Sequence, residues 1–310
     1  MAIARSAMRP VRTFMRSPEE RAVESEIRTI EVTGQSVRVA LYGSAGAART
    51  LLVFNGIGAS LETVTPFAMQ FRDTRVVTFD VPGVGGSPAP ALPYRFAWLA
   101  RISAHLLDAL GIGEVDVFGV SWGGALAQQF VHDFPGRSRS LTLAATCAGF
   151  VMVPGSLRVL MQLATPRRYG NPAHMLEVGP DIYGGQLRFD RDLLAKHALA
   201  MRATTGRGYL YQMLAGVGWT SWLWLPRVRV PSLILMGADD PIVPTVNGRM
   251  IADRLPDARL EIVDCGHLFI LTDPAGTASR IESFLHDERD GAAVATHLPP
   301  AGPFTTDTRG

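Results

Sequence analysis

Short apolar runs rich in β-branched residues recur along the chain, with helical segments between them. Runs of this kind are typical of strands buried on both faces of a mostly parallel sheet that helices cover. The clearest six are Leu51 to Phe54, Val76 to Phe79, Val115 to Gly119, Leu141 to Ala145, Leu233 to Met236 and Leu260 to Val263. Ahead of them, Ile30 to Tyr42 alternates around Gly34 and predicts a hairpin at the antiparallel edge. The pattern therefore predicts an α/β domain.

The regular alternation is interrupted once, in the second half of the chain. Residues 149–225 are rich in prolines, glycines, aromatics and methionines and do not continue the strand and helix pattern. We expect them to form a cap, or lid, inserted between two strands of the core. The core itself is then expected to comprise residues 26–148 and 226–288.

The two ends of the chain differ from the core in composition. Residues 1–25 predict a mobile extension, although they could instead form a surface-binding arm. They carry the arginines Arg5, Arg9, Arg12 and Arg16. Residues 289–310 turn to Gly, Ala, Thr and Pro without apolar periodicity and predict a disordered tail.

Composition narrows the classes of partner. Of 310 residues, 47% are hydrophobic and 19% charged, so there is ample material for a buried core. The formal net charge is +2, and the basic residues are scattered arginines with a single lysine, Lys196. Because no basic stripe is evident, nucleic acid is not an expected partner.

Cysteine usage and the N-terminus bear on location. The two cysteines, Cys147 and Cys265, cannot build a disulfide framework, and their spacing to the histidines matches no common zinc pattern. We therefore expect no structural metal. The N-terminus lacks the apolar run and cleavage site of a secretory signal, so a cytoplasmic location is predicted.

One long segment has no charge. Gly208 to Pro226 contains no charged residue. Its length of 19 residues is sufficient for a helix to span a bilayer. Its polar residues Gln212, Thr220 and Ser221, its three glycines and its terminal proline argue against a transmembrane helix. No membrane span is expected.

Gly119-Val120-Ser121-Trp122-Gly123 is a G-x-S-x-G pentapeptide. Such a pattern also occurs by chance, but here it follows a predicted strand and precedes a predicted helix, Ala125 to Phe134. That setting places Ser121 on a sharp turn where it can act as a nucleophile. The N–H of Trp122 at the positive end of the helix is a candidate donor to a developing oxyanion.

A second oxyanion donor is expected from the loop after the strand that ends at Phe54. This loop reads Asn55-Gly56-Ile57-Gly58, and the N–H that follows the first glycine, that of Ile57, is our candidate. Asn55 stands where serine hydrolases with a G-x-S-x-G turn commonly carry His. It could brace the loop, end the strand or contact substrate.

A serine nucleophile needs a histidine to accept its proton and a carboxylate to orient that histidine. His267 follows a predicted strand, whereas His105 and His132 lie within predicted helices. The pair Asp239-Asp240 closes the preceding strand, which gives the chain order Ser, Asp, His. Asp240 is our candidate, since related hydrolases usually place the acid three residues after a glycine such as Gly237.

A glycine-rich segment, residues 80–87, follows another strand and begins at Asp80. We interpret it as structural support for the active-site face. It lacks both the lysine of a P-loop and the spacing of a dinucleotide-binding fingerprint. No cofactor is expected.

These blocks resemble the intracellular polyhydroxyalkanoate depolymerases that act on medium-chain-length polyester granules. The resemblance runs from Ile30 to Glu288 and rests on the segments 54–59, 79–87, 119–130, 218–221 and 266–269. It implies an α/β-hydrolase fold, a triad of Ser121, Asp240 and His267, and 3-hydroxyacyl ester polymers or oligomers as substrate. The two ends of the chain depart from the pattern, so granule targeting by those ends is not carried over.

An insoluble polyester offers apolar side chains and no charge, so the cap aromatics could hold it. Trp219 and Trp222 are the candidates for substrate contact, and core packing of the cap is the alternative explanation of these aromatics. Two rival functions remain: a small-molecule carboxylesterase or carbon–carbon bond hydrolase on the same fold, and a non-catalytic granule- or ligand-binding protein. Acyl chain length and oligomeric state stay open.

Overall fold

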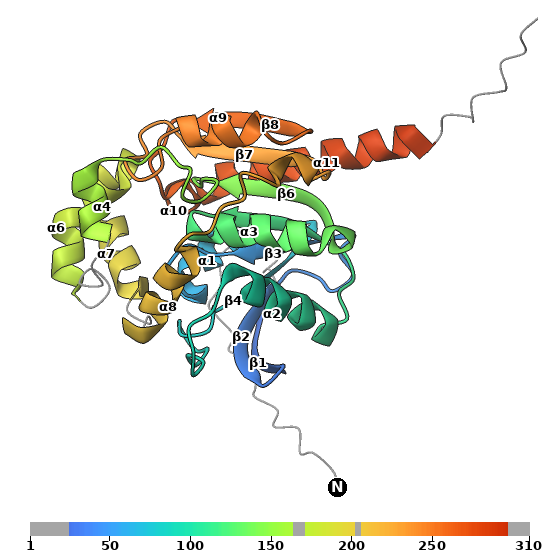
Figure 1. Ribbon diagram of the computed structural model, residues 1–310, viewed down its shortest axis with the longest axis horizontal. Helices are drawn as coiled ribbons and strands as arrows, with labels where there is room; N and C mark the ends of the chain where they lie inside the picture. Colours follow the sequence, from blue (N-terminus) through green and yellow to red (C-terminus); the bar gives the residue numbers. More distant parts are fainter. Residues whose placement is uncertain (1–24, 164–170, 202–205, 297–310) are drawn as a thin grey trace, which may run out of the picture.

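The structure, a computed structural model, describes residues 25–163, 171–201 and 206–296, and the account below concerns those residues. They form an eight-stranded sheet in the order β1-β2-β4-β3-β5-β6-β7-β8 (Figure 1). The strands are β1 (Ser25–Val32), β2 (Gln35–Tyr42), β3 (Arg49–Phe54), β4 (Thr74–Phe79), β5 (Val115–Val120), β6 (Ser138–Ala144), β7 (Ser232–Gly237) and β8 (Ala258–Val263). The pairs β1–β2 and β2–β4 are antiparallel, and all the others are parallel.

The predicted strands are confirmed. Each of the six apolar runs coincides with one strand from β3 to β8, with Ala145 one residue past the end of β6, and the hairpin forms the antiparallel edge. The central strands are largely apolar because both faces of the sheet are covered. In β3, for example, Leu52 and Phe54 enter one core cluster, whereas Leu51 and Val53 enter the other.

Helices cover both faces of the sheet. The first core cluster includes residues of α2 (Phe96–Ala109), α3 (Trp122–Asp133) and α9 (Val246–Ala252). The second cluster includes residues of α1 (Leu61–Ala68), α10 (Phe269–Thr272) and α11 (Pro274–Thr296). A short 3-10 helix, η1 (Pro135–Arg137), links α3 to β6. The predicted fold class, a mostly parallel sheet flanked by helices, is confirmed.

Between β6 and β7 the chain leaves the sheet and forms a helical region that we call the cap (Figure 1). Its elements are α4 (Leu157–Leu163), α6 (Pro172–Tyr183), η2 (Gly185–Arg188), α7 (Arg191–Ala200), α8 (Gly206–Gly216) and η4 (Leu225–Arg227). This is the inserted region that the sequence predicted. Within the described residues, no helix has the length and apolar character that crossing a membrane requires.

One boundary prediction was wrong. Helix α11 continues to Thr296, so residues 289–296 are helical where a disordered tail was expected. Three alanines lie in this stretch, and alanine has the highest helix propensity, so a helix can continue there without apolar periodicity. The remaining tail and the predicted N-terminal extension, apart from Ser25, lie outside the described residues.

Candidate active site

The turn between β5 and α3 holds Ser121 in an unusual backbone conformation. Its φ and ψ angles are 54° and −120°, a region that residues other than glycine rarely adopt. The Ser121 N–H donates to the carbonyl of Ala144 at 2.8 Å, and the Thr146 hydroxyl donates to the Ser121 carbonyl at 2.7 Å. Strand β6 therefore fixes the strained turn from its side.

Glycines around the turn are sterically required. A Cβ atom on Gly119 would lie 2.3 Å from the carbonyl oxygen of Gly123, and one on Gly123 would lie 2.2 Å from that of Phe54. Both contacts are with backbone, which cannot move aside. The two glycines of the pentapeptide thus allow α3 to start directly against β3 and β5.

Side chains from three distant segments meet at the carboxyl edge of the sheet. The Oγ atom of Ser121 lies 3.0 Å from Nε2 of His267, and Nδ1 of His267 lies 2.7 Å from Oδ2 of Asp240. The Asp240 and His267 side chains are only 0% and 4% exposed. This hydrogen-bonded chain has the order that nucleophilic catalysis by serine needs.

The Asp240 carboxylate is fixed on its other side by backbone. Its Oδ1 atom accepts the N–H groups of Ile242 and Val243 at 2.8 and 2.9 Å. These bonds hold the carboxylate in one orientation and leave Oδ2 for the imidazole. They also favour the tautomer of His267 that carries its proton on Nδ1.

The neighbouring Asp239 points elsewhere and anchors the cap. Its carboxylate accepts the Arg188 guanidinium at 2.9 and 3.0 Å and the Gly185 N–H at 2.7 Å. The Arg188 guanidinium, and to a lesser degree the Gly185 N–H, hold the pKa of Asp239 below its usual range. The two adjacent aspartates therefore serve different contacts.

The cap also helps to hold the loop that carries His267, a contact that no sequence motif indicates. The backbone N–H of His267 donates to the carbonyl of Tyr183, at the end of α6, at 2.8 Å. A Cβ atom on Gly266 would lie 2.3 Å from the same carbonyl. The cap backbone thus packs directly on the loop that carries His267.

Both predicted oxyanion donors lie beside the serine. Ile57 and Trp122 line one cavity together with Ser121 and His267. Trp122 is the first residue of α3, which directs its N–H toward the N-terminal end of the helix. Asn55 also lines the cavity, but its side chain is engaged in bracing the loop.

The bracing contacts of Asn55 are local. Its Nδ2 atom donates to the Ser60 carbonyl at 3.0 Å and to the Thr63 hydroxyl at 2.8 Å. Its Oδ1 atom accepts the N–H of Gly56 at 2.9 Å. Of the roles considered from the sequence, loop bracing is the one that these contacts favour.

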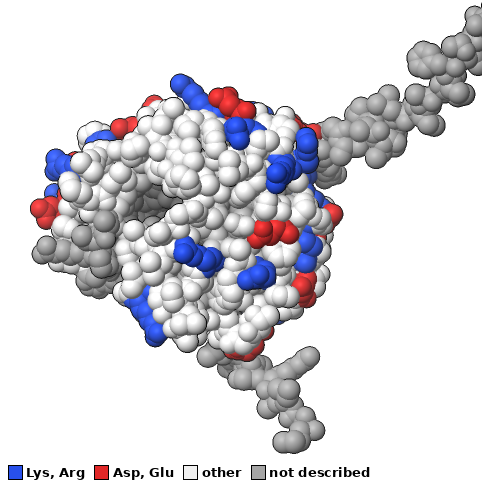
Figure 2. Space-filling view, in the orientation of Figure 1, with Lys and Arg blue, Asp and Glu red and all other residues white. Residues whose placement is uncertain are grey.

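The cavity has a volume of about 370 Å³ and lies between the cap and the edge of the sheet. Most of its lining is apolar: Ile57, Ala59, Val120, Met152, Leu160, Leu163, Met201, Met213, Ile242, Leu268, Ile270 and Leu271. Among the lining residues that sequence analysis missed are Thr63, Tyr183 and His197, because their helices carry no motif. Figure 2 shows a hollow beside the cap, and none of the described side chains at its visible rim is charged. An uncharged, apolar group would fit this space.

The two tryptophans predicted to contact substrate do not line this cavity. Trp219 donates to the Gln129 side chain at 2.7 Å and packs against Phe96, while the Arg254 guanidinium lies over the Trp222 ring, 4.4 Å from its centroid. The prediction of substrate contact is therefore not supported for either residue. Both tryptophans are partly buried and pack against the core cluster, in line with the alternative considered from the sequence.

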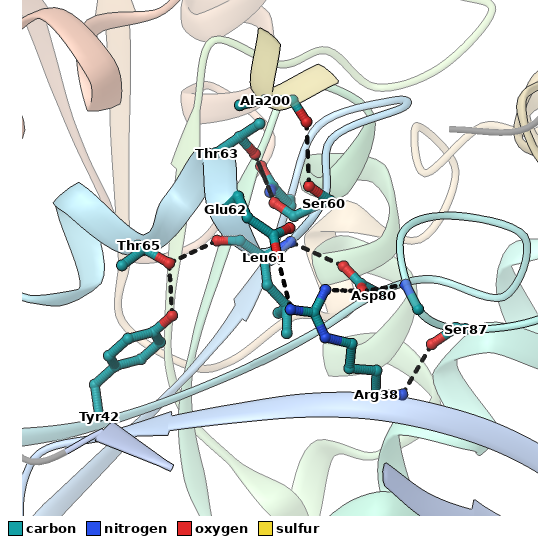
Figure 3. Close-up of polar contacts among 12 residues, drawn as sticks. Arg38, Tyr42, Ser60, Leu61, Glu62, Thr63, Thr65, Asp80, Ser87 and Ala200 are labelled. Atoms are coloured by element: carbon teal, nitrogen blue, oxygen red, sulfur yellow. Dashed lines mark hydrogen bonds and ion pairs between the residues drawn. The ribbon is translucent and has the colours of Figure 1, made fainter. Parts of the chain in front are cut away.

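A buried carboxylate connects the loops below the site (Figure 3). Asp80 is fully buried and accepts the N–H groups of Leu61 and Gly86, both at 2.8 Å, and the Arg38 guanidinium at 3.0 Å. Burial raises the pKa of Asp80, and these three donors act in the opposite direction. Arg38 is paired in turn with Glu62. Asp80 thus ties the start of α1 to the glycine-rich loop, in line with its predicted supporting role.

Replacing Asp80 by Ala is expected to destabilise the fold by about 3 kcal/mol, because two buried N–H groups would lose their acceptor. Chemical denaturation of the purified variant measures this difference. Asp73→Ala, at an exposed position before β4, is the matched control and should change stability by less than about 0.5 kcal/mol. Equal effects of the two substitutions would contradict the role given to Asp80.

The described residues contain no group of three or more His, Cys, Asp or Glu side chains that could hold a metal ion. Both cysteines are free, and burial raises the pKa of the Cys147 thiol. Neither cysteine takes part in the hydrogen-bonded chain from Ser121 to Asp240.

Comparison with known proteins gives consistent matches. Residues 51–280 match the family model described as "Alpha/beta hydrolase family". The poly(3-hydroxyalkanoate) depolymerase of Ectopseudomonas oleovorans is 50% identical over 275 residues, covering 88% of this chain and 96% of that protein. The 3-oxoadipate enol-lactonase 2 of Acinetobacter baylyi is 25% identical, over 83% of this chain and 96% of that protein. Among solved structures, the enol-lactonase of Burkholderia xenovorans LB400 has a TM-score of 0.73 at 23% identity, over 84% of this chain and 100% of that chain, which shows the shared fold.

Proposed function

The chain belongs to the α/β hydrolase family, and from this premise we propose that it hydrolyses ester bonds of poly(3-hydroxyalkanoate) or its oligomers through an acyl-enzyme on Ser121. The observation that carries the proposal is the hydrogen-bonded chain Ser121–His267–Asp240 at the wall of an apolar cavity. The 50% identity to a poly(3-hydroxyalkanoate) depolymerase supports the substrate class.

The first half of the cycle forms the acyl-enzyme. His267 takes the proton of the Ser121 hydroxyl through Nε2 while Oγ attacks the ester carbonyl. The resulting oxyanion accepts the N–H groups of Ile57 and Trp122. The same imidazole then gives its proton to the leaving alkoxide, and the alcohol end of the polymer departs.

The second half releases the acid. His267 takes a proton from a water molecule, which attacks the acyl-enzyme carbonyl. Collapse of this second tetrahedral intermediate returns the proton to Ser121 and frees a 3-hydroxy acid or a shorter oligomer. Asp240 stabilises the imidazolium in both halves, because its Oδ2 atom faces Nδ1.

Purified protein assayed on three substrates tests the proposal: an emulsion of medium-chain-length polyester, short nitrophenyl esters, and a ring-cleavage dienoate. Clearing of the emulsion is expected. Activity on soluble esters alone would point to a small-molecule carboxylesterase, and turnover of the dienoate to a carbon–carbon bond hydrolase. Binding of the polymer without turnover would indicate a non-catalytic binding protein.

The cap offers a surface for the polymer next to the cavity. Helix α8 and the residue that follows it expose four apolar side chains, Leu210, Met213, Leu214 and Val217, which are 53%, 40%, 38% and 62% exposed. We call these four residues the α8 stripe. Met213 also lines the cavity, so the stripe is continuous with the site. An apolar stripe that leads into an apolar cavity suits the surface of a polyester granule, and association with granules in the cytoplasm is part of the proposal.

The double variant Leu210→Gln/Leu214→Gln tests this surface. Hydrolysis of the polyester emulsion should fall about tenfold, since two half-exposed leucines would no longer be buried against polymer. Hydrolysis of a soluble nitrophenyl ester should be unchanged, because Met213 and the cavity remain. The control pair Ile27→Gln/Ile262→Gln alters side chains that are 54% and 44% exposed on β1 and β8. If both pairs lower emulsion activity equally, the α8 stripe is not the docking surface.

A further inference from the structure

Helix α8 of the cap is hydrogen-bonded to the core beside the active site at Gln212. This side chain is fully buried. Its Oε1 atom accepts the backbone N–H of Gly58 at 2.9 Å, and its own backbone carbonyl accepts the indole N–H of Trp122 at 2.9 Å. A single position of the cap therefore contacts two separate segments of the core.

These two segments are the ones that carry the proposed oxyanion donors. Gly58 directly follows Ile57. Its N–H belongs to the Ile57–Gly58 peptide, which adjoins the Gly56–Ile57 peptide that carries the proposed donor, the Ile57 N–H. Gly58 has a φ of 70°, so the Ile57–Gly58 peptide is not held by a regular strand or helix. Trp122 carries the other proposed donor on its own backbone.

Apolar packing on the same loop is present but does not set the direction of a peptide plane. Ile57 and Ala59 pack against Met201 and Tyr209 of the cap. Such contacts depend on buried area, whereas a hydrogen bond depends on the angle of the N–H group. The hydrogen bond from the Gly58 N–H to the side-chain oxygen of Gln212 therefore restrains the direction of this N–H, which packing alone does not.

We infer that Gln212 is a positioning residue for the oxyanion hole: its side-chain oxygen holds the Ile57–Gly58 peptide and thereby restrains the backbone of Ile57, whose own N–H lies in the preceding Gly56–Ile57 peptide. The inference rests on the proposed function, since it takes Ser121 as nucleophile and the N–H groups of Ile57 and Trp122 as donors. It assigns Gln212 no contact with the substrate, because Gln212 does not line the cavity.

A second property of Gln212 makes the inference testable by substitution. Its Nε2 atom has no hydrogen-bond partner in the described part of the chain. Replacement by Met keeps the length of the side chain and removes the acceptor of the Gly58 N–H without breaking a bond at Nε2. The bond from Trp122 to the backbone carbonyl of residue 212 can also remain.

The test compares Gln212→Met and Gln212→Leu with Ser221→Ala. Ser221 is also a buried cap residue that bonds to the core, at 2.6 Å to Gln128, but it does not contact the oxyanion loop. A trifluoromethyl ketone serves as probe. Ser121 Oγ adds to its carbonyl carbon, the serine proton passes to His267, and the carbonyl electron pair becomes an oxyanion. A methyl ketone of the same chain, which forms no stable adduct, measures ground-state binding.

Both Gln212 variants should lower kcat on a soluble nitrophenyl ester by about tenfold to a hundredfold with little change in KM, and should weaken trifluoromethyl ketone binding by the same factor. Binding of the methyl ketone should not change, and Ser221→Ala should change neither ketone. Wild-type affinity of folded Gln212→Met or Gln212→Leu for the trifluoromethyl ketone would overturn the inference alone. A wild-type protein that forms no adduct at all would overturn the proposed function as well.

Discussion

Replacing Ser121 by Ala is expected to lower kcat for ester hydrolysis by about 10⁴- to 10⁶-fold. Without the hydroxyl there is no atom to form the acyl-enzyme, and only the oxyanion donors and the binding cavity remain to assist a water molecule. The measurement is initial-rate kinetics on both a nitrophenyl ester and the polyester emulsion. Activity on the two substrates should fall together, because both depend on the same nucleophile.

A matched control separates loss of the nucleophile from loss of the fold. Ser103 is a buried serine on α2 whose hydroxyl donates to the Leu99 carbonyl at 2.8 Å, away from the cavity. Ser103→Ala should leave kcat within about twofold, since the lost bond is worth only about 1 kcal/mol of stability. If Ser121→Ala retained more than a few per cent of wild-type activity while folded, another group would have to be the nucleophile.

The second large effect on kcat is expected when Asp240 is replaced, whereas the same replacement of its neighbour Asp239 should have a small effect. Asp240→Asn should lower kcat by about 10⁴-fold, because an amide at this position favours the wrong tautomer of His267 and cannot stabilise its charged form. Asp239→Asn should stay within about tenfold of wild type. It weakens a half-exposed ion pair with Arg188, which is worth at most about 1 kcal/mol.

Steady-state kinetics of the two asparagine variants, with thermal unfolding as a check on the fold, measure the difference. The comparison is internally controlled, since the substitutions are identical and one residue apart. Equal losses of kcat would contradict the different contacts described for the two side chains. They would indicate that the loop as a whole, and not one carboxylate, serves His267.

The core and its reactive groups could be predicted from the sequence because local chemistry fixes them. Strands such as β5 are largely apolar, with the buried Asp116 as an exception, and the turn at Ser121 needs glycines on both sides, so both leave a readable pattern. The order Ser, Asp, His follows from the way successive parallel strands end at the same edge of a sheet. The structure brings these three side chains together, as their placement at strand ends predicts.

The cap could not be predicted in the same way. Its helices pack through contacts that join residues far apart in the chain, such as Trp219 with Gln129 or Gln212 with Gly58. No local periodicity encodes such pairs. An aromatic-rich segment therefore suggested substrate contact by Trp219 and Trp222, whereas the structure uses these side chains for packing, and methionines and leucines of the cap line the cavity instead.

The disagreement at the end of the chain has a different cause. A lack of apolar periodicity indicates that a segment has nothing to bury, but it does not exclude a helix. Helix α11 runs to Thr296 through an alanine-rich stretch, where intrinsic propensity alone favours continuation. For residues 289–296, composition indicated a disordered tail and helix propensity favoured a helix. The structure has a helix there.

The central claim is that Ser121 carries the acyl group during hydrolysis of a 3-hydroxyalkanoate ester. Turnover of a medium-chain 3-hydroxyalkanoate oligomer, stopped with acid within the first cycle and followed by peptide mapping with mass spectrometry, tests it directly. We predict one added 3-hydroxyacyl unit on the peptide that contains Ser121, and none on that peptide in Ser121→Ala. An acyl group on a different residue, or rapid hydrolysis of the oligomer by folded Ser121→Ala, would contradict the account.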